Sequence, residues 1–237
     1  MERIQAGVNK CIHVLMLNAP FVQNIGLFEG KMGFAIVFAH LYQKTCNSVF
    51  YDYMDEILDN IVVHLHKGFS YGMSNGLSGI GWGIEYLLQK NFITGNGVEI
   101  CEEIDEQIMQ TNPLRIKDLS LETGIEGLLY YVLFHIQGSL KQQSLLPFDS
   151  VYRYNLYEKV KSLTLNNQSD TLYKLSRAYI QWYENGFLNY LVDIRSFVKQ
   201  VNFNIDLLST YPLGIREGLA GWLLLYLLDE KTNIHIR

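Results

Sequence analysis

Four short stretches place polar side chains immediately before a Gly-x-x-Gly pair. These side chains are Glu29, Asn75, Glu122 with Thr123, and Arg216 with Glu217. Carboxylates gathered around one opening could share acid–base chemistry, because a general acid and a general base need different protonation states at the same pH. Glu29, Glu122 and Glu217 are therefore the weak catalytic candidates that the sequence offers.

Two other roles are open for the same stretches. Asn and Thr are good helix N-caps, and a carboxylate in the first turn of a helix is stabilised by the helix dipole. Thr123 and Glu126 have the spacing of a capping box. If the stretches instead line the mouth of a cavity, the ligand-binding set is Glu29, Asn75, Thr123, Glu126, Arg216 and Glu217. Arg216 would then pair with a neighbouring carboxylate or with an acidic ligand.

The sequence gives no pattern of metal ligands. Cys11, Cys46 and Cys101 are far apart, and none belongs to a CxxC or CxH pattern. His40 and His135 fall deep in apolar segments, where we expect hydrogen bonds to the backbone. We therefore expect no metal site and no cofactor. An odd number of isolated cysteines is typical of a reduced, intracellular protein.

The paired glycines recur at a nearly constant interval, which indicates an internal repeat. The first glycines of the pairs are Gly30, Gly76, Gly124 and Gly218, at intervals of 46, 48 and 94 residues. The last interval is twice the others, and a copy without glycines at Thr171 fills the gap. The pattern predicts five units with a period of about 47 residues.

Each unit is predicted to be a helical hairpin. Amphipathic outer helices are expected at residues 4–17, 51–66, 98–109, 151–163 and 187–201. Inner helices, apolar nearly all round and hence buried, are expected near 28–42, 75–89, 122–136, 170–184 and 216–229. Strand signals are weak. The prediction is an all-α fold, a single α/α-toroid-like domain over residues 1–237 that forms a toroid or a curved array of about five hairpins. The glycines would let the incoming loop and neighbouring helices approach closely.

Composition excludes several function classes. Hydrophobic residues make up 49% of the 237 residues, the formal net charge is −5, and no Lys/Arg cluster occurs. A nucleic-acid-binding protein needs a basic stripe to pair with phosphates, so we expect no nucleic-acid partner. The longest apolar run, Leu219–Leu228, is too short for a membrane span. The amino-terminal segment makes a poor signal peptide, and we expect a cytoplasmic protein.

Two phrases carry a resemblance to a known family. NGLSGIGWGIEYLL at 75–88 and EGLAGWLLLYLL at 217–228 resemble the glycine-rich starts of inner helices in the lanthionine synthetase C-like (LanC-like) family. These proteins are cyclase components of lantibiotic biosynthesis, and the resemblance implies an α/α toroid. It also implies zinc, which the family's synthetases hold through two cysteines and a histidine in Trp-Cys-x-Gly and Cys-His-Gly phrases. That zinc lowers the pKa of a substrate thiol, whose thiolate adds to a dehydrated serine or threonine. Neither phrase occurs in this chain.

The first functional prediction is a short LanC-like protein without a zinc site. It would be a non-catalytic accessory or binding protein in peptide modification, in a lanthipeptide-like pathway, with a peptide or a modification enzyme as its partner. An open edge of the ring would favour a homo-oligomer. One alternative is a metal-independent α/α-toroid enzyme, a carbohydrate-active hydrolase or lyase that uses the carboxylates at the cavity mouth. Another is a helical-repeat scaffold for protein interaction.

Overall fold

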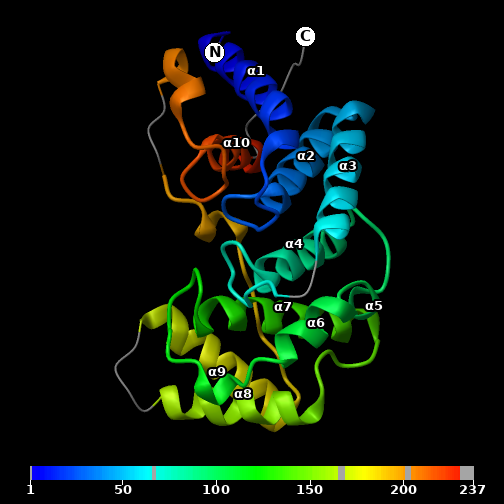
Figure 1. The fold of residues 1–237 in the computed structure, drawn as a ribbon, viewed down its shortest axis with the longest axis vertical. Helices are drawn as coiled ribbons and strands as arrows, with labels where there is room; N and C mark the ends of the chain where they lie inside the picture. The colour runs from blue at the N-terminus through cyan, green and yellow to red at the C-terminus, as the bar shows by residue number, and fades with distance from the viewer. Residues whose placement is uncertain (1, 66–67, 165–168, 201–203, 230–237) are drawn as a thin grey trace. The chain divides into compact units, whose positions relative to one another are not determined.

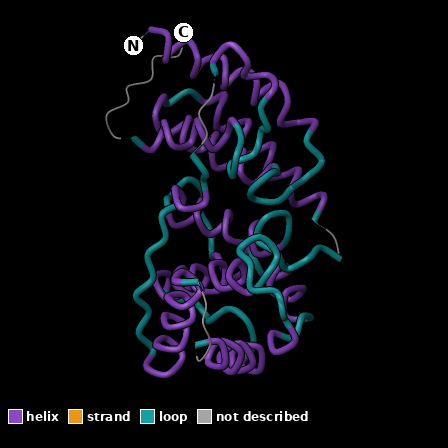
Figure 2. Tube along the Cα trace, turned by 90° about the vertical axis from the view of Figure 1, so that its left-hand side faces the viewer, coloured by secondary structure: helices purple, strands orange, loops and turns teal. Residues whose placement is uncertain are grey.

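The computed structural model describes residues 2–65, 68–164, 169–200 and 204–229 (Figure 1). Within these ranges the chain forms helices and loops but no strand (Figure 2). The predicted all-α fold class is therefore confirmed. No helix in the described ranges combines the length and the apolar character that crossing a bilayer would require.

The contacts divide the chain into two compact units. Unit 1 combines Met1–His66 with Val192–Arg237, and unit 2 is Lys67–Leu191. Unit 1 is thus built from two segments that are distant in the sequence, whereas unit 2 is continuous. The prediction of a single domain stays a prediction.

Unit 1 packs a hairpin of two long helices against a short apolar helix. Its elements are α1 (Glu2–Asn18), η1 (Ala19–Phe21), α2 (Lys31–Thr45), α3 (Ser48–His64), η3 (Ile194–Phe197), η4 (Ile205–Thr210) and α10 (Leu219–Leu228). Helices α2 and α3 lie side by side, and α10 packs on α2 and α1 (Figure 1). Only Cys46 and Asn47 separate α2 from α3. Cys46 ends α2 in the left-handed conformation, and the Asn47 side chain caps α3 by accepting a hydrogen bond from the Val49 N–H.

Unit 2 is built around α4 and α7. Its elements are α4 (Leu77–Gln89), α5 (Gly97–Ile100), α6 (Glu102–Met109), η2 (Pro113–Arg115), α7 (Ile125–Gln142), α8 (Ser150–Leu163) and α9 (Asp170–Asn185). Helix α4 packs on α7, α7 packs on α9, and α9 packs on α8. Trp82 of α4 is fully buried, with the rings of Tyr86 and Phe134 stacked at 5.3 and 5.2 Å. Helices that are apolar all round thus form the core, as the sequence predicts.

Nine of the ten predicted helices are present. The inner helices α2, α4, α7 and α10 begin directly after the first glycine of each pair, two or three residues later than predicted. Helix α9 matches the position of the copy without glycines, but it is not apolar all round as predicted, since Tyr173, Lys174 and Arg177 are exposed. The outer helices are α1, α3, α5 with α6, and α8. The ends of two predicted outer helices, His66 and Val201, lie outside the described residues.

The predicted outer helix at 187–201 is wrong. In the described part of this range only the short η3 is helical. Gly186 ends α9 in the left-handed conformation, and the apolar side chains that follow enter different cores. Tyr190 is buried in unit 2, where its hydroxyl donates to the Tyr130 carbonyl, and Phe197 packs on Phe28 in unit 1. Because these two side chains are buried in the cores of different units, the segment does not form one continuous helix.

Candidate functional site

The loops before the glycine-marked inner helices share one backbone structure. In each, the residue after the first glycine donates its N–H to a carbonyl seven residues upstream. The four hydrogen bonds are Lys31 to Asn24 at 2.9 Å, Leu77 to Ser70 at 2.8 Å, Ile125 to Asp118 at 2.9 Å and Leu219 to Pro212 at 2.8 Å. The loop carbonyls therefore satisfy helix-start N–H groups that would otherwise lack partners.

The glycines lie where this loop leaves no room for a side chain. A Cβ on Gly30 would lie 2.6 Å from the Asn24 carbonyl oxygen, and one on Gly124 would lie 2.6 Å from that of Asp118. The second glycine of a pair is equally enclosed, since a Cβ on Gly127 would lie 2.6 Å from the Met73 Cβ. Close packing of loop on helix thus accounts for these glycines without a ligand.

The predicted capping box is wrong. The N-cap of α7 is Gly124, and no side chain caps the helix. Thr123 instead donates its hydroxyl to the Asp118 carboxylate at 2.5 Å, and Glu126 accepts a hydrogen bond from the Ser169 hydroxyl at 3.2 Å. At the start of the helix the Asp118 carbonyl accepts the Ile125 N–H, so a loop carbonyl takes the place of a side-chain cap.

Neighbouring loops dock on one another in the same way in both units. In unit 1 the Ile215 N–H donates to the Phe28 carbonyl at 2.7 Å. In unit 2 the Met73 and Ser74 N–H groups donate to the Glu122 carbonyl, each at 2.9 Å. In both cases the acceptor stands two residues before the first glycine of its copy, and Ile215 and Met73 stand three residues before theirs.

The candidate residues therefore come together as two groups, one in each unit. Glu29, Arg216 and Glu217 belong to the docked loops of unit 1. Asn75, Glu122, Thr123 and Glu126 belong to the loops of unit 2 and the first turn of α7. A single mouth lined by all of them stays a prediction.

The unit 1 group contains an ion pair, an arginine on an aromatic ring and one carboxyl group with a raised pKa. Arg216 donates to the Phe197 carbonyl at 3.0 Å, and its guanidinium lies 5.1 Å from the centre of the Phe28 ring. Glu217 forms an exposed ion pair with Lys199, which lowers the pKa of Glu217. Partial burial and then the charge of Glu217 raise the pKa of Glu29, while Arg216 partly offsets that rise. Glu29 and Glu217 thus have pKa values shifted in opposite directions.

In the loop before α7, a hydroxyl and a backbone N–H hold the exposed carboxylate of Asp118. Asp118 accepts from the Thr123 hydroxyl and, at 2.8 Å, from the Ser120 N–H. These bonds lower the pKa of Asp118 and keep it ionised. Asn75 is exposed beside Ser74, whose hydroxyl donates to it at 3.3 Å.

Sequence reasoning missed a buried ionic network in unit 2. His135 of α7 lies between Glu85 of α4, at 2.6 Å from Nδ1, and Asp105 of α6, at 3.0 Å from Nε2. All three residues are at least 95% buried. The expectation that His135 bonds the backbone is therefore wrong. The available signal was Glu85 itself, a lone carboxylate in the apolar helix GIGWGIEYLL, since a buried Glu needs a partner.

A comparison with known protein families identifies the family of this chain. The family model of lanthionine synthetase C-like proteins matches residues 2–146, which is more than half of the sequence. The chain belongs to the lanthionine synthetase C-like family. A search of curated proteins found no match, and a search of solved structures found none either.

The matched segment of this LanC-like protein contains α1 to α7. The resemblance that the glycine phrases predict is thus confirmed. Glu29 and the candidates of unit 2 lie inside the segment, whereas Arg216 and Glu217 lie beyond it.

The residues of this LanC-like protein do not fit the zinc that the family implies. Cys11 and Cys101 are buried within helical segments, and Cys46 is exposed at the end of α2. Burial raises the pKa of the Cys11 thiol to about 12, which opposes the thiolate form that zinc binds. In the described ranges no three His, Cys, Asp or Glu side chains are placed to hold a metal ion. Both ring nitrogens of the buried His135 already bond carboxylates.

Proposed function

We propose that this LanC-like protein binds peptides in a peptide-modification pathway and does not itself close thioether rings. The observation that carries the proposal is the chemistry of the loop starts. They present Glu29, Asn75, Thr123 and Glu217 where the family's synthetases hold zinc, and the neighbouring N–H groups of Met73, Ser74 and Ile215 already donate to loop carbonyls. Carboxylates and amides can accept hydrogen bonds from a peptide but do not activate a thiol as zinc does.

The exposed carboxylates of the loops favour a peptide that supplies positively charged or N–H hydrogen-bond donors. Glu29 and Asp118 are exposed carboxylates, and such groups attract lysine, arginine or backbone N–H donors. Lys199 and Arg216 already engage Glu217 and the Phe197 carbonyl. We therefore expect a lysine-containing peptide to bind more tightly than its glutamate counterpart, and salt to weaken binding.

A cyclisation assay tests the absence of catalysis. The probe is a synthetic peptide with one dehydroalanine and one cysteine, incubated with the protein in the presence and absence of zinc. We expect the free thiol to disappear at the rate seen in buffer alone. A zinc-dependent acceleration by this protein would refute the proposal.

Fluorescence anisotropy with labelled lysine-containing and glutamate-containing peptides tests the binding. We expect Glu29→Gln to weaken binding of the lysine peptide by roughly two- to fivefold, the range of one exposed ion pair. Asp59→Asn, which removes a charge from the exposed face of α3, is the matched control and should leave binding unchanged. Absence of binding by either peptide would count against a peptide-binding role.

A second candidate function rests on the opposite pKa shifts of Glu29 and Glu217. Such a pair suits a metal-independent hydrolase or lyase with Glu29 as general acid and Glu217 as general base. The rate would then fall at low pH as Glu217 gains a proton, and at high pH as Glu29 loses one. On a panel of aryl glycosides we expect a bell-shaped pH profile, and Glu29→Gln should lower the rate by roughly 10²- to 10⁴-fold. A flat profile, or an active Glu29→Gln variant, would dismiss this enzyme.

A further inference from the structure

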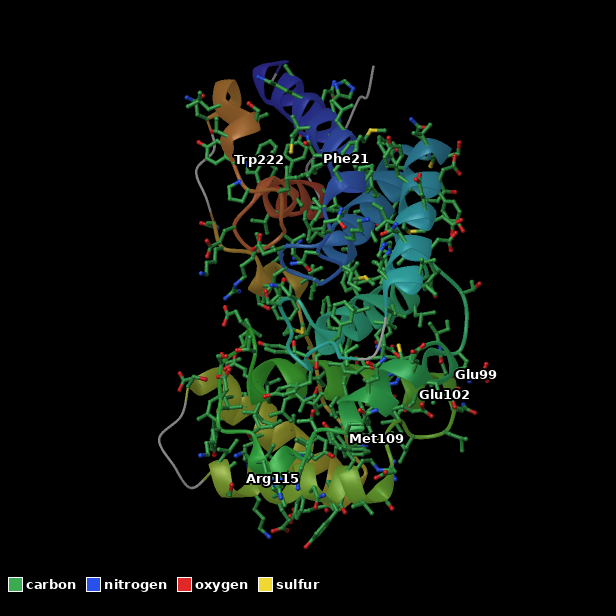
Figure 3. The ribbon with its side chains drawn as sticks, in the orientation of Figure 1. Phe21, Glu99, Glu102, Met109, Arg115 and Trp222 are labelled. Carbon is green, nitrogen blue, oxygen red and sulfur yellow. The ribbon has the colours of Figure 1, made fainter. Side chains whose placement is uncertain are left out.

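Helices α5 and α6 form a short outer segment of unit 2. Its outer side carries Glu99 and Glu102, which are exposed and point away from the rest of the unit (Figure 3). Its inner side carries Cys101 and Asp105, which are 0% and 4% exposed. The segment packs on α4 and α7. A polar group on its inner side must therefore find its partner on those helices.

The partner of Asp105 is His135, and the two carboxylates beside His135 determine its protonation state. Glu85 and Asp105 approach its two ring nitrogens, and an ionised carboxylate only accepts hydrogen bonds. With both carboxylates ionised, both nitrogens must donate, so the ring is an imidazolium. Loss of one proton would turn one nitrogen lone pair towards a carboxylate oxygen and leave two buried negative charges without a cation.

The surroundings hold the carboxylates in place. A Cβ on Gly97 of α5 or on Gly138 of α7 would come closer than 3.0 Å to an oxygen of Glu85, so both backbones close over that carboxylate. Gln89 of α4 donates to Glu85 at 3.1 Å.

Further titratable groups face Asp105. Tyr131 of α7 donates its hydroxyl to Asp105 at 2.6 Å. The Cys101 thiol and, from α8, the Tyr152 hydroxyl are also buried near Asp105. None of these groups supplies a second positive charge.

We propose that the Glu85–His135–Asp105 network is a proton-operated latch. It holds α5 and α6 on α4 and α7 while His135 carries both ring protons, and it releases them when His135 loses one. The device needs no ligand and is independent of the peptide-binding proposal.

The direction of the pH dependence follows from the surroundings. Burial alone would lower the pKa of His135, but the hydrogen bonds and charges of Asp105 and Glu85 outweigh it and raise the pKa from 6.5 to about 9. A raised folded-state pKa gives stability that is complete below 6.5 and is lost as the pH rises through about 9. Opening of the segment should therefore increase roughly tenfold for each pH unit between these two values and then level off.

Cys101 provides a direct reporter because it becomes accessible only when the segment opens. The experiment measures alkylation rates of Cys101 and Cys11 by peptide mass spectrometry between pH 6.5 and 10. Cys11 is a matched internal control, since it is also buried but belongs to unit 1, whereas all three residues of the network belong to unit 2. The ratio of the two rates removes the common effect of pH on thiol reactivity. We expect this ratio to rise steeply up to about pH 9, and a ratio that stays constant would overturn the latch.

Two further measurements keep the test decisive. Asp105→Asn removes one charge and should flatten the pH dependence of the ratio, whereas Glu99→Gln on the exposed side should preserve it. If Asp105→Asn fails to fold, the pKa of His135 in the wild-type protein, measured from the pH titration of its ¹³C NMR signal, still tests the latch. We expect this pKa to lie well above the ordinary histidine range, and an ordinary histidine pKa would overturn the latch.

Discussion

Replacing Gly221 by alanine should destabilise unit 1 by about 3 kcal/mol or more, near the upper end of what overpacking a buried site costs. Gly221 is the second glycine of the last pair, in the first turn of α10. A Cβ there would come closer than 3.0 Å to the Ile215 carbonyl oxygen and would lie 2.9 Å from the Val198 side chain. The carbonyl oxygen cannot move away cheaply, because the same loop docks on Phe28 through the Ile215 N–H.

Urea denaturation followed by circular dichroism measures the effect. Gly186→Ala is an informative control because that glycine has a φ of +68° and nothing lies within 4 Å of an added Cβ. It should cost about 1–2 kcal/mol through backbone strain alone. If Gly221→Ala costs no more than Gly186→Ala, close packing is not the reason for the glycine pair.

Replacing His135 by glutamine should cost unit 2 about 3–5 kcal/mol at neutral pH, the range for removing one partner of a buried ion pair. Glu85 and Asp105 would then be buried without the cation between them. The loss should be largest below pH 6.5 and should shrink as the pH rises through about 9, where the wild-type network itself loses its proton.

Chemical denaturation at several pH values measures this difference. His13→Gln, at an exposed position of α1, is the control and should change stability by less than about 0.5 kcal/mol. Simultaneous apolar replacement of Glu85, Asp105, Tyr131 and His135 should cost less than His135→Gln alone, because no buried charge is left unpaired. If the His135→Gln variant is as stable as the wild type, the network does not hold unit 2 together.

The sequence supports the prediction of the hairpins because their signals are local. The interval between glycine pairs and the apolar character of the inner helices locate α2, α4, α7 and α10, and the surviving apolar rhythm locates α9. Signals that depend on tertiary context failed. The apolar stripe at 187–201 is real, but Tyr190 and Phe197 serve different cores, which periodicity cannot reveal.

The candidate site was predictable only in part. Polar side chains do stand on docked loops, as the spacing indicates. The loops, however, satisfy the helix starts with their own carbonyls, so that Thr123 and Glu126 are not caps. The pairing of Glu85 with His135 spans 50 positions and that of Asp105 spans 30, and neither has a sequence motif that announces it. Only the presence of charge in apolar helices hints at them.

The docking of the Ile215 loop on Phe28 has a consequence for the order of folding. The Cys11 thiol lies 3.6 Å from the Leu219 carbonyl, 208 positions away, so unit 1 is closed by contacts of very long range. During synthesis, α1, α2 and α3 emerge long before α10, and the apolar surface that α10 covers stays open in the meantime. Unit 2 is continuous in the chain and can form its own contacts as it emerges. Helices α1, α2 and α3 therefore leave the ribosome before unit 2 but belong to a unit that is completed after it, and the surface that waits for α10 is where a chaperone would bind.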